Sequence, residues 1–198
     1  MRKFSVLSVV ALVTVLFLQL DAAAAKLSVG DKAPDFKATN VDGKEMSLDS
    51  VKDAKVVVIA FSCNKCPVAV AYEDRFIDFT KKYTDKGVKF IALNVNFNED
   101  LDMMKQRAEE KDFNFPYAYD QSAESYKAYG ALYTPHLYVL DGDRKVAYIG
   151  AFDDKMNVTE VTKHYVADAV DAILAGKKPE TAETKAFGCT IKRPAGEK

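Results

Sequence analysis

The fold is decided by residues 56–67, which read VVVIAFSCNKCP. The first six are apolar and mostly β-branched, which predicts a strand buried on both faces of a sheet. Apolar residues then recur every three or four positions and predict one face of a helix: Val68, Tyr72, Phe76, Phe79 and Tyr83. Proline is tolerated in the first turn of a helix, so we expect this helix to start at the cysteine motif itself, with Pro67 in its first turns.

A C-x-x-C pair, Cys63 and Cys66, lies where the predicted strand gives way to the helix. Backbone N–H groups at a helix N-terminus favour negative charge, so we expect this position to lower the pKa of the Cys63 thiol and make it a nucleophile. Lys65, between the two sulfurs, adds a second positive influence. Two thiols at this spacing can close into a disulfide and open again, which is the chemistry of dithiol–disulfide exchange.

Two other interpretations of the pair stay open. It could be a purely structural disulfide. It could also be half of a zinc site, but zinc takes four ligands, and only Cys189, His136 and His164 remain as soft ligands. None of these forms a second close pair, so no metal site is predicted. The passage from strand to helix favours the redox interpretation.

The first 25 residues have the pattern of a secretory signal peptide. Arg2 and Lys3 precede an apolar run over residues 4–20, and small residues up to Ala25 offer a cleavage site. An uncleaved anchor is the alternative, but the run is short for a membrane span. We therefore expect a periplasmic or secreted protein, cleaved near Ala25 and free of the membrane afterwards. Disulfides persist in such compartments.

Composition and charge bound the rest of the chain. It has 198 residues, a formal net charge of −1 and three cysteines. A nucleic-acid partner would call for a basic stripe, which the sequence lacks. We expect one domain over residues 26–176 and a polar tail over residues 177–198 that carries Cys189, lies on the surface and has no regular structure. We expect the protein to be a monomer.

The remaining elements predict an α/β protein. A turn at Asp42-Gly43 predicts an N-terminal β-hairpin within residues 36–48. Further strands are expected at 88–94, 115–119, 137–140 and 146–149, and further helices at 101–111, 123–129 and 159–174. This order implies a mixed central β-sheet flanked by helices on both faces.

Four motifs follow one another along the chain. They are GDKAPDF at 30–36, CNKCP at 63–67, Thr134-Pro135, and FGCTIK at 187–192. This ordered set resembles the thioredoxin-fold redoxins of the alkyl hydroperoxide reductase/thiol-specific antioxidant type. Within them it resembles an exported, peroxiredoxin-like subgroup. The resemblance extends from about residue 29 to about residue 192, nearly all of the expected mature chain.

The resemblance implies the thioredoxin fold and a set of roles. Cys63 would be the exposed attacking thiolate and Cys66 the buried resolving thiol, so that a redox-active Cys63–Cys66 disulfide takes the place of a cofactor. Pro135 would be cis and would face the sulfurs. The backbone of Thr134 would then pair with an extended substrate segment as an added strand.

The sequence also departs from these relatives. Typical peroxiredoxins carry a proline and a threonine ahead of their reactive cysteine. If Cys66 stands at that position, Ile59 and Cys63 occupy those places. No arginine stands at a position that marks it as the peroxide-activating residue. Arg75 and Arg144 are candidates only because they are arginines.

Four other residues have expected roles. Cys189 is a possible third redox thiol that docks near Cys63 and forms an alternative disulfide. His136 and His164 are expected to be structural or surface residues. Asn157 begins a glycosylation pattern, but we favour a role as a helix cap.

The leading hypothesis is an exported thiol–disulfide oxidoreductase with a protein or small-molecule thiol or disulfide as substrate. The alternative is a peroxiredoxin-like thiol peroxidase with antioxidant activity. A minor alternative is a copper-binding module of the thioredoxin fold, because two cysteines and a histidine can bind soft metals.

Overall fold

The computed structural model describes residues 27–194 and Gly196, so the predicted signal peptide lies outside the described residues. Over that part of the chain, a seven-stranded sheet runs in the order β2-β1-β5-β4-β3-β7-β8, and β6 and β9 form a separate pair. The strands are β1 (Ala38–Asn40), β2 (Glu45–Met46), β3 (Val56–Phe61), β4 (Val88–Asn94), β5 (Tyr117–Tyr119), β6 (Tyr133–Thr134), β7 (His136–Leu140), β8 (Val146–Gly150) and β9 (Cys189–Thr190).

Strand β3 lies in the interior of the sheet and carries the cysteine motif at its end. Every residue of β3 is buried, as its continuous apolar sequence predicts. It pairs in parallel with β4, from Val56 opposite Val88 to Phe61 opposite Leu93, and antiparallel with β7. Because β3 and β4 are parallel, their carboxyl ends meet at one edge of the sheet, and the motif leaves β3 at that edge.

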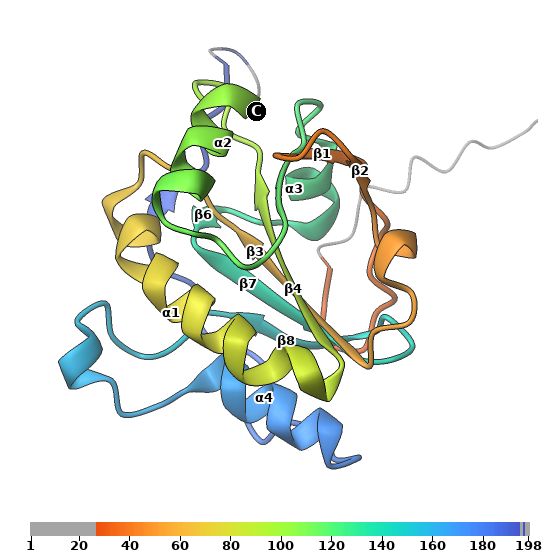
Figure 1. Cartoon of the computed structure of the whole chain (residues 1–198). Helices are drawn as coiled ribbons and strands as arrows, with labels where there is room; N and C mark the ends of the chain where they lie inside the picture. The colour runs from red at the N-terminus through yellow and green to blue at the C-terminus, as the bar shows by residue number, and fades with distance from the viewer. Residues whose placement is uncertain (1–26, 195, 197–198) are drawn as a thin grey trace, which may run out of the picture.

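Helices cover both faces of the sheet, which confirms the predicted α/β class (Figure 1). On one face α1 (Pro67–Tyr83), α2 (Leu101–Glu110) and α4 (Tyr165–Leu174) pack against alternate residues of the central strands. On the other face α3 (Glu124–Tyr129) and the N-terminal segment cover the remaining core. Among the helices described within residues 27–194, none combines the length and apolarity that a membrane crossing needs.

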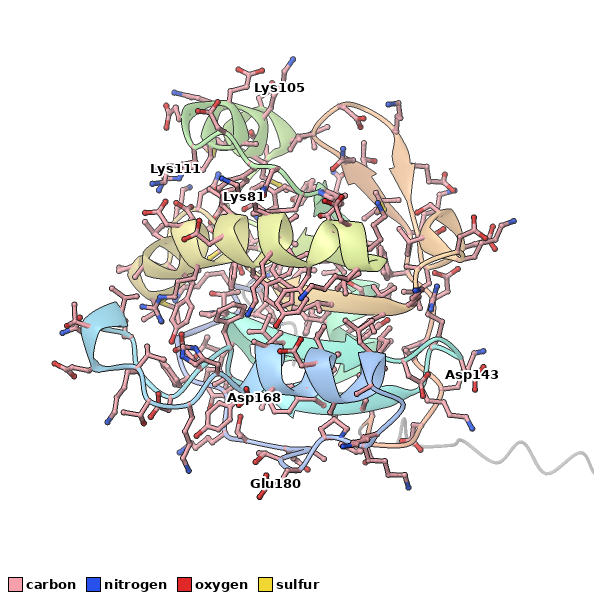
Figure 2. All side chains as sticks on the ribbon, turned by 60° about the horizontal axis from the view of Figure 1, so that its bottom comes forward. Lys81, Lys105, Lys111, Asp143, Asp168 and Glu180 are labelled. Carbon is pink, nitrogen blue, oxygen red and sulfur yellow. A yellow bond between two sulfur atoms is a disulfide. The ribbon has the colours of Figure 1, made fainter. Side chains whose placement is uncertain are left out.

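The apolar stripe of α1 packs into a layer of aromatic rings, as its periodicity predicts. Phe76 lies with its ring centroid 5.0 Å from Phe90 of β4 and 5.2 Å from Phe152. Charged residues occupy the outer sides of the helices, among them Lys81 on α1 and Asp168 on α4 (Figure 2). Burial of this aromatic layer fixes α1, and hence the cysteines that precede it, against the sheet.

One helix starts later than predicted. Helix α4 begins at Tyr165 and not at residue 159, and Val158–Glu160 form only a short 3-10 turn. The Asn157 side chain caps that turn, as expected of a cap. The Asp154 carboxylate then accepts hydrogen bonds from the backbone N–H (2.9 Å) and hydroxyl (2.6 Å) of Thr162. These bonds satisfy the backbone outside a helix, so the helix starts only after them.

The C-terminal tail is ordered over its described part, which corrects the prediction of a segment without regular structure. Residues 182–184 run along the edge of β8, where Ile149 N–H donates to the Ala182 carbonyl (3.1 Å) and Thr184 N–H donates to the Ile149 carbonyl (2.9 Å). Farther on, the tail forms β9 and buries Ile191 in the core. The division into a domain and a tail stays a prediction.

Arg144, a predicted candidate for peroxide activation, is buried at the β7–β8 turn. Its guanidinium donates to the backbone carbonyls of Val51 (2.7 Å), Lys52 (2.9 Å), Ala54 (3.0 Å), Asp141 (3.1 Å) and Gly142 (3.1 Å). The register of β3 and β7 places this turn beyond Val57, at the opposite end of β3 from the cysteines. Arg144 therefore ties two loops together far from the motif.

Replacing Arg144 by methionine should lower the free energy of unfolding by about 2 to 4 kcal/mol, because buried carbonyls lose their donors. Denaturant unfolding measures the change. The neighbouring Lys145→Met variant is the control, since Lys145 is exposed, and its change should stay within about 0.5 kcal/mol. Equal effects of the two substitutions would contradict this role of Arg144.

Candidate active site

Cys66, and not Cys63, stands at the N-terminus of α1. The helix begins at Pro67, and Cys66 is its N-cap residue, with an extended backbone (φ −86°, ψ 116°). The Cys66 sulfur accepts a hydrogen bond from the N–H of Ala69 at 3.5 Å. The sequence predicts a helix that starts at the cysteine motif itself, with Pro67 in its first turns. Since proline fits best as the first helical residue, the three residues before Cys66 remain outside the helix.

The Thr134–Pro135 peptide bond is cis, which confirms that prediction. Thr134 faces both sulfurs of the motif. Its hydroxyl oxygen lies 3.3 Å from Cys63 Sγ, and its carbonyl oxygen lies 3.1 Å from Cys66 Sγ. The structure thus brings together the four residues that the sequence placed in one site, although they are about 70 positions apart, at separations of 71 and 68.

The disulfide in this structure joins Cys66 to Cys189, and Cys63 is a free thiol. The expected Cys63–Cys66 bond is therefore not the one present. Cys189 packs beside Cys63 as expected, and the alternative disulfide that it forms is with Cys66. The reason is the position of β9, which pairs antiparallel with β6 and sets Cys189 opposite Thr134. The Cα atoms of Cys66 and Cys189 are then 5.8 Å apart, within the range a disulfide spans.

The expectation of an exposed Cys63 is also wrong for this state. The relative exposure of Cys63 is 2% and that of Cys66 is 3%. Both pack with Ala69, and Cys189 covers them. The tail that supplies the third sulfur therefore also excludes solvent from the other two.

The pKa of the Cys63 thiol is raised, where the sequence predicted a lowered one. Burial is the largest cause. The Thr134 hydroxyl lowers the pKa by hydrogen bonding, and the negative charge of Glu99 raises it. The N–H groups of Cys66 and Lys65 lower it as well. Net, Cys63 is held as a neutral thiol while the tail is in place.

The Lys65 side chain does not point at the sulfurs. Its ammonium donates to the Asn98 carbonyl at 2.5 Å and lies at the exposed rim of the site. Lys65 therefore lowers the pKa of Cys63 through its backbone N–H, and not through its side chain as predicted.

Glu99 is the residue that sequence reasoning missed. It is 3% exposed, and its carboxylate accepts hydrogen bonds from the N–H groups of Asn64 (2.8 Å) and Lys65 (3.1 Å) and from Nδ2 of Asn94 (2.8 Å). It therefore takes the N–H of Asn64, and it shares with Cys63 the N–H of Lys65, which also lowers the pKa of Cys63. A signal was available, because Glu99 follows the carboxyl end of β4, next to that of β3, where sites gather in such sheets.

Tyr117 of β5, like Glu99, binds Asn64 of the motif. Its hydroxyl donates to Oδ1 of Asn64 at 2.8 Å. Burial raises the pKa of Tyr117 well above its ordinary value, so the hydroxyl stays a donor. Asn64 is thereby fixed at both its backbone and its side chain.

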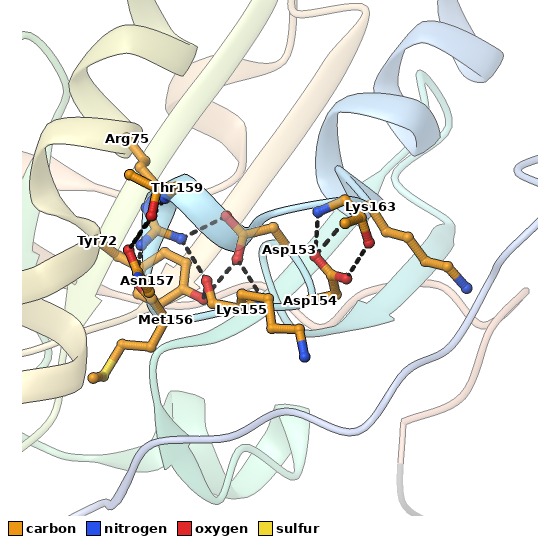
Figure 3. A network of polar contacts seen from close by, with 10 residues as sticks. Tyr72, Arg75, Asp153, Asp154, Lys155, Met156, Asn157, Thr159 and Lys163 are labelled. Atoms are coloured by element: carbon orange, nitrogen blue, oxygen red, sulfur yellow. Dashed lines mark hydrogen bonds and ion pairs between the residues drawn. The ribbon is translucent and has the colours of Figure 1, made fainter.

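Arg75, the other arginine candidate, serves a loop and not the sulfurs (Figure 3). Its guanidinium donates to the buried Asp153 carboxylate (2.6 Å) and to the carbonyls of Lys155 (2.8 Å) and Met156. It also lies over the Tyr72 ring, 4.1 Å from the centroid. Nine helical positions separate Arg75 from Cys66, roughly 13 Å along the axis.

One histidine lies in the interior and the other on the surface, as expected. His136 is buried and packs at a tilt against Tyr138 with ring centroids 4.9 Å apart, while His164 is exposed at the start of α4. Over residues 27–194, no three or more His, Cys, Asp and Glu side chains are grouped as metal ligands would be.

Known proteins resemble this chain over most of the described region. The model of the AhpC/TSA family matches residues 29–149. The thiol-disulfide oxidoreductase ResA of Bacillus thuringiensis subsp. konkukian is 31% identical over 123 residues, which are 61% of this chain and 68% of the relative.

Two solved structures extend the comparison. A hypothetical protein of Sinorhizobium meliloti has a TM-score of 0.81 at 32% identity, covering 86% of this chain and 97% of its own. The thioredoxin domain of a thiol-disulfide oxidoreductase from Bacteroides vulgatus has a TM-score of 0.55 at 18% identity, covering 61% and 86%. The latter likeness shows the thioredoxin fold alone, and that fold is the one predicted.

Replacing Glu99 by glutamine should lower the pKa of Cys63, because the substitution removes the negative charge that opposes the thiolate. In the oxidised protein Cys63 is the one remaining thiol, so the thiolate absorbance followed against pH reports its titration directly. The titration midpoint should move to lower pH.

The matched control is Asp100→Asn, which removes the same charge one residue away at an exposed position. Its midpoint should stay at the wild-type value, since water and salt screen exposed charge. A Glu99→Gln midpoint that is unchanged or higher would contradict the electrostatic role of Glu99.

Proposed function

Because this chain belongs to the AhpC/TSA family, we propose that it is a thiol–disulfide oxidoreductase that works through Cys63 and Cys66. One observation carries the proposal. All three cysteines of the sequence gather at Thr134 and the cis Pro135, with one pair bonded and the third thiol packed beside it. Such an arrangement favours exchange of a disulfide among neighbouring sulfurs.

In this proposal Cys66 makes the bond to the substrate, in place of Cys63. Cys66 is at the helix N-terminus, where backbone N–H groups favour the thiolate. The reduced Cys66 thiolate attacks one sulfur of a substrate disulfide. A Cys66–substrate mixed disulfide forms, and the other substrate sulfur leaves as a thiolate that takes up a proton.

Cys63 then resolves the mixed disulfide. Its thiolate, with the Thr134 hydroxyl 3.3 Å away to donate a hydrogen bond, attacks Cys66 Sγ. A Cys63–Cys66 disulfide forms and the second substrate thiolate leaves, so the substrate gains two electrons and the enzyme loses two. The Cys189 thiolate then attacks Cys66 Sγ, and Cys63 leaves as a thiolate that takes up a proton, which restores the Cys66–Cys189 bond of the resting oxidised form. An external dithiol returns the enzyme to its reduced form. The same steps in reverse oxidise a substrate dithiol.

We further propose that the protein works as a monomer after export, in a periplasmic or extracellular compartment. The signal-like residues 1–25 support this location, as does a structure with one formed disulfide. Its substrates are then proteins or small molecules that carry thiols or disulfides outside the cytoplasm.

Two double variants separate the roles of the motif cysteines. Cys63→Ser/Cys189→Ser keeps Cys66 alone, and Cys66→Ser/Cys189→Ser keeps Cys63 alone. Each is reduced and mixed with glutathione disulfide, and the mixed disulfide is followed by mass spectrometry. The variant that keeps Cys66 should react at least about tenfold faster, because its sulfur lies at the helix N-terminus, where backbone N–H groups favour the thiolate.

Faster reaction of the variant that keeps Cys63 would return the attacking role to Cys63. If neither variant reacted faster than free cysteine, the oxidoreductase function itself would be rejected. Circular dichroism of both variants serves as the control for folding.

A thiol peroxidase is the second candidate, and the Cys66–Cys189 bond favours it. In such a cycle the Cys66 thiolate would attack a peroxide and release water or an alcohol. The resulting sulfenic acid would condense with the Cys189 thiol and release water, leaving the bond present in the structure. Against this candidate, the guanidinium groups of Arg75 and Arg144 are held by other partners.

The reduced protein should therefore react with hydrogen peroxide no faster than free cysteine does. Stopped-flow measurement of thiol loss checks this, with the Cys66→Ser variant as the matched control. A wild-type rate far above that of both free cysteine and Cys66→Ser would establish the peroxidase in place of the oxidoreductase.

A further inference from the structure

The tail occupies its site in the way that a substrate would. Cys189 pairs antiparallel with Thr134, and Thr190 pairs with Tyr133, so the tail adds a strand beside the cis proline. Its sulfur is bonded to Cys66 at the same place. A substrate caught as a mixed disulfide needs these two features together, backbone pairing and a sulfur–sulfur bond.

We call the edge formed by Thr134, Pro135 and Cys66 the seat. We infer that the C-terminal segment over residues 187–191 occupies the seat as an internal substrate, at the place where a cysteine-containing segment of a partner protein binds during turnover. The inference rests on the proposed function and adds the class of partner that the site accepts.

Gly188 defines that class most sharply. A Cβ atom at this position would lie 2.2 Å from the Thr134 carbonyl oxygen and 2.8 Å from its carbonyl carbon. The backbone of Gly188 also has φ +149°, which other residues rarely adopt. Thr134 cannot withdraw, because its carbonyl oxygen and hydroxyl contact Cys66 and Cys63. A segment that sits in the seat therefore needs glycine directly before its cysteine.

Side chains on either side of Gly188 and Cys189 refine the class. Phe187 packs edge-on against Tyr72 of α1, with ring centroids 6.2 Å apart. Ile191 is buried, and its N–H donates to the Leu132 carbonyl at 3.1 Å. The partner segment is thus an extended aromatic–Gly–Cys sequence with an apolar residue two positions after the cysteine.

Apolar side chains at the rim extend the surface that such a partner would cover. Leu132 is 48% exposed and Phe97 is 55% exposed. Both contact the departing tail through their backbones, since Phe97 N–H donates to the Lys192 carbonyl at 3.4 Å. Exposed apolar residues beside a strand-pairing edge are typical of surfaces that bind a protein segment.

An internal exchange frees the seat. The Cys63 thiolate attacks Cys66 Sγ, the Cys63–Cys66 bond forms and the Cys66–Cys189 bond breaks. The electron pair leaves on the Cys189 sulfur, which takes up the proton that Cys63 lost, so no outside oxidant or reductant is consumed. Released from its covalent bond, the tail then competes with a partner's segment for the Thr134 edge. A partner thiolate in the seat then attacks Cys66 Sγ, so that a Cys66–partner disulfide forms, the Cys63–Cys66 bond breaks, and Cys63 leaves as a thiolate that takes up the partner's proton.

The test uses two peptides and three full-length proteins. One peptide is AFGCTIK, the sequence of residues 186–192, with its cysteine in a mixed disulfide with a chromophoric aryl thiol. The second has alanine in place of the glycine. The reduced proteins are wild type, Gly188→Ala and, as the matched control, Gly196→Ala. Gly196 also has positive φ (+99°), but among the described residues no atom lies within 4 Å of its added Cβ.

Wild type should release the chromophore from the glycine peptide at least about tenfold faster than from the alanine peptide, because the added methyl group clashes in the seat. The Gly188→Ala protein should release it from the glycine peptide faster than wild type, since its own tail no longer fits and stops competing. Gly196→Ala should match wild type. Equal rates with the two peptides, or a Gly188→Ala protein no faster than wild type, would overturn the inference.

A small aromatic disulfide, which needs no seat, separates this inference from the proposed function. If wild type reduces the small disulfide but does not distinguish the peptides, only the inference falls. If wild type reduces neither the small disulfide nor the peptides faster than free cysteine, the exchange chemistry fails and the inference falls with it.

Discussion

The pairing of Thr134 with Cys189 is the contact on which the site depends. Through it one residue contacts all three cysteines: the Thr134 hydroxyl is 3.3 Å from Cys63 Sγ, its carbonyl oxygen is 3.1 Å from Cys66 Sγ, and its backbone is paired with Cys189. The sheet supports this junction from below. Strands β3 and β7 lie side by side, with Phe61 opposite His136, so the end of one strand and the start of the other deliver the motif and the cis proline together.

The electrostatics of the site follow from how its backbone donors are shared. The N-terminus of α1 donates to Cys66, while Glu99 takes the N–H of Asn64 and shares the N–H of Lys65 with Cys63. Cys63 is left buried beside a carboxylate, and its pKa is raised. A thiol held neutral does not attack the neighbouring disulfide, so the oxidised form keeps the tail bonded until Cys63 loses its proton. Burial by the tail and the charge of Glu99 thus act in the same direction.

Much of this could be predicted from sequence. The apolar run at 56–61 and the aromatic spacing along α1 specify elements strongly, and the order of motifs identified the fold and the cis proline. The partner of Cys189 could not be predicted, because 123 residues separate it from Cys66 and spacing carries no information over that distance. The weak strand β9, two residues long, has no periodic signal and depends on its pairing with β6. Glu99 lies in a polar loop, where a carboxylate is ordinarily solvated, but here it is buried and bonded to Asn94 of β4 and to the backbone of the motif.

The most direct test of this account is a disulfide map of the native, oxidised wild-type protein, made by alkylation, proteolysis and mass spectrometry. The account predicts that Cys66 is linked to Cys189 and that Cys63 is alkylated only after the protein is denatured. A map in which Cys63 is linked to Cys66, with Cys189 free and readily alkylated in the native protein, would contradict it.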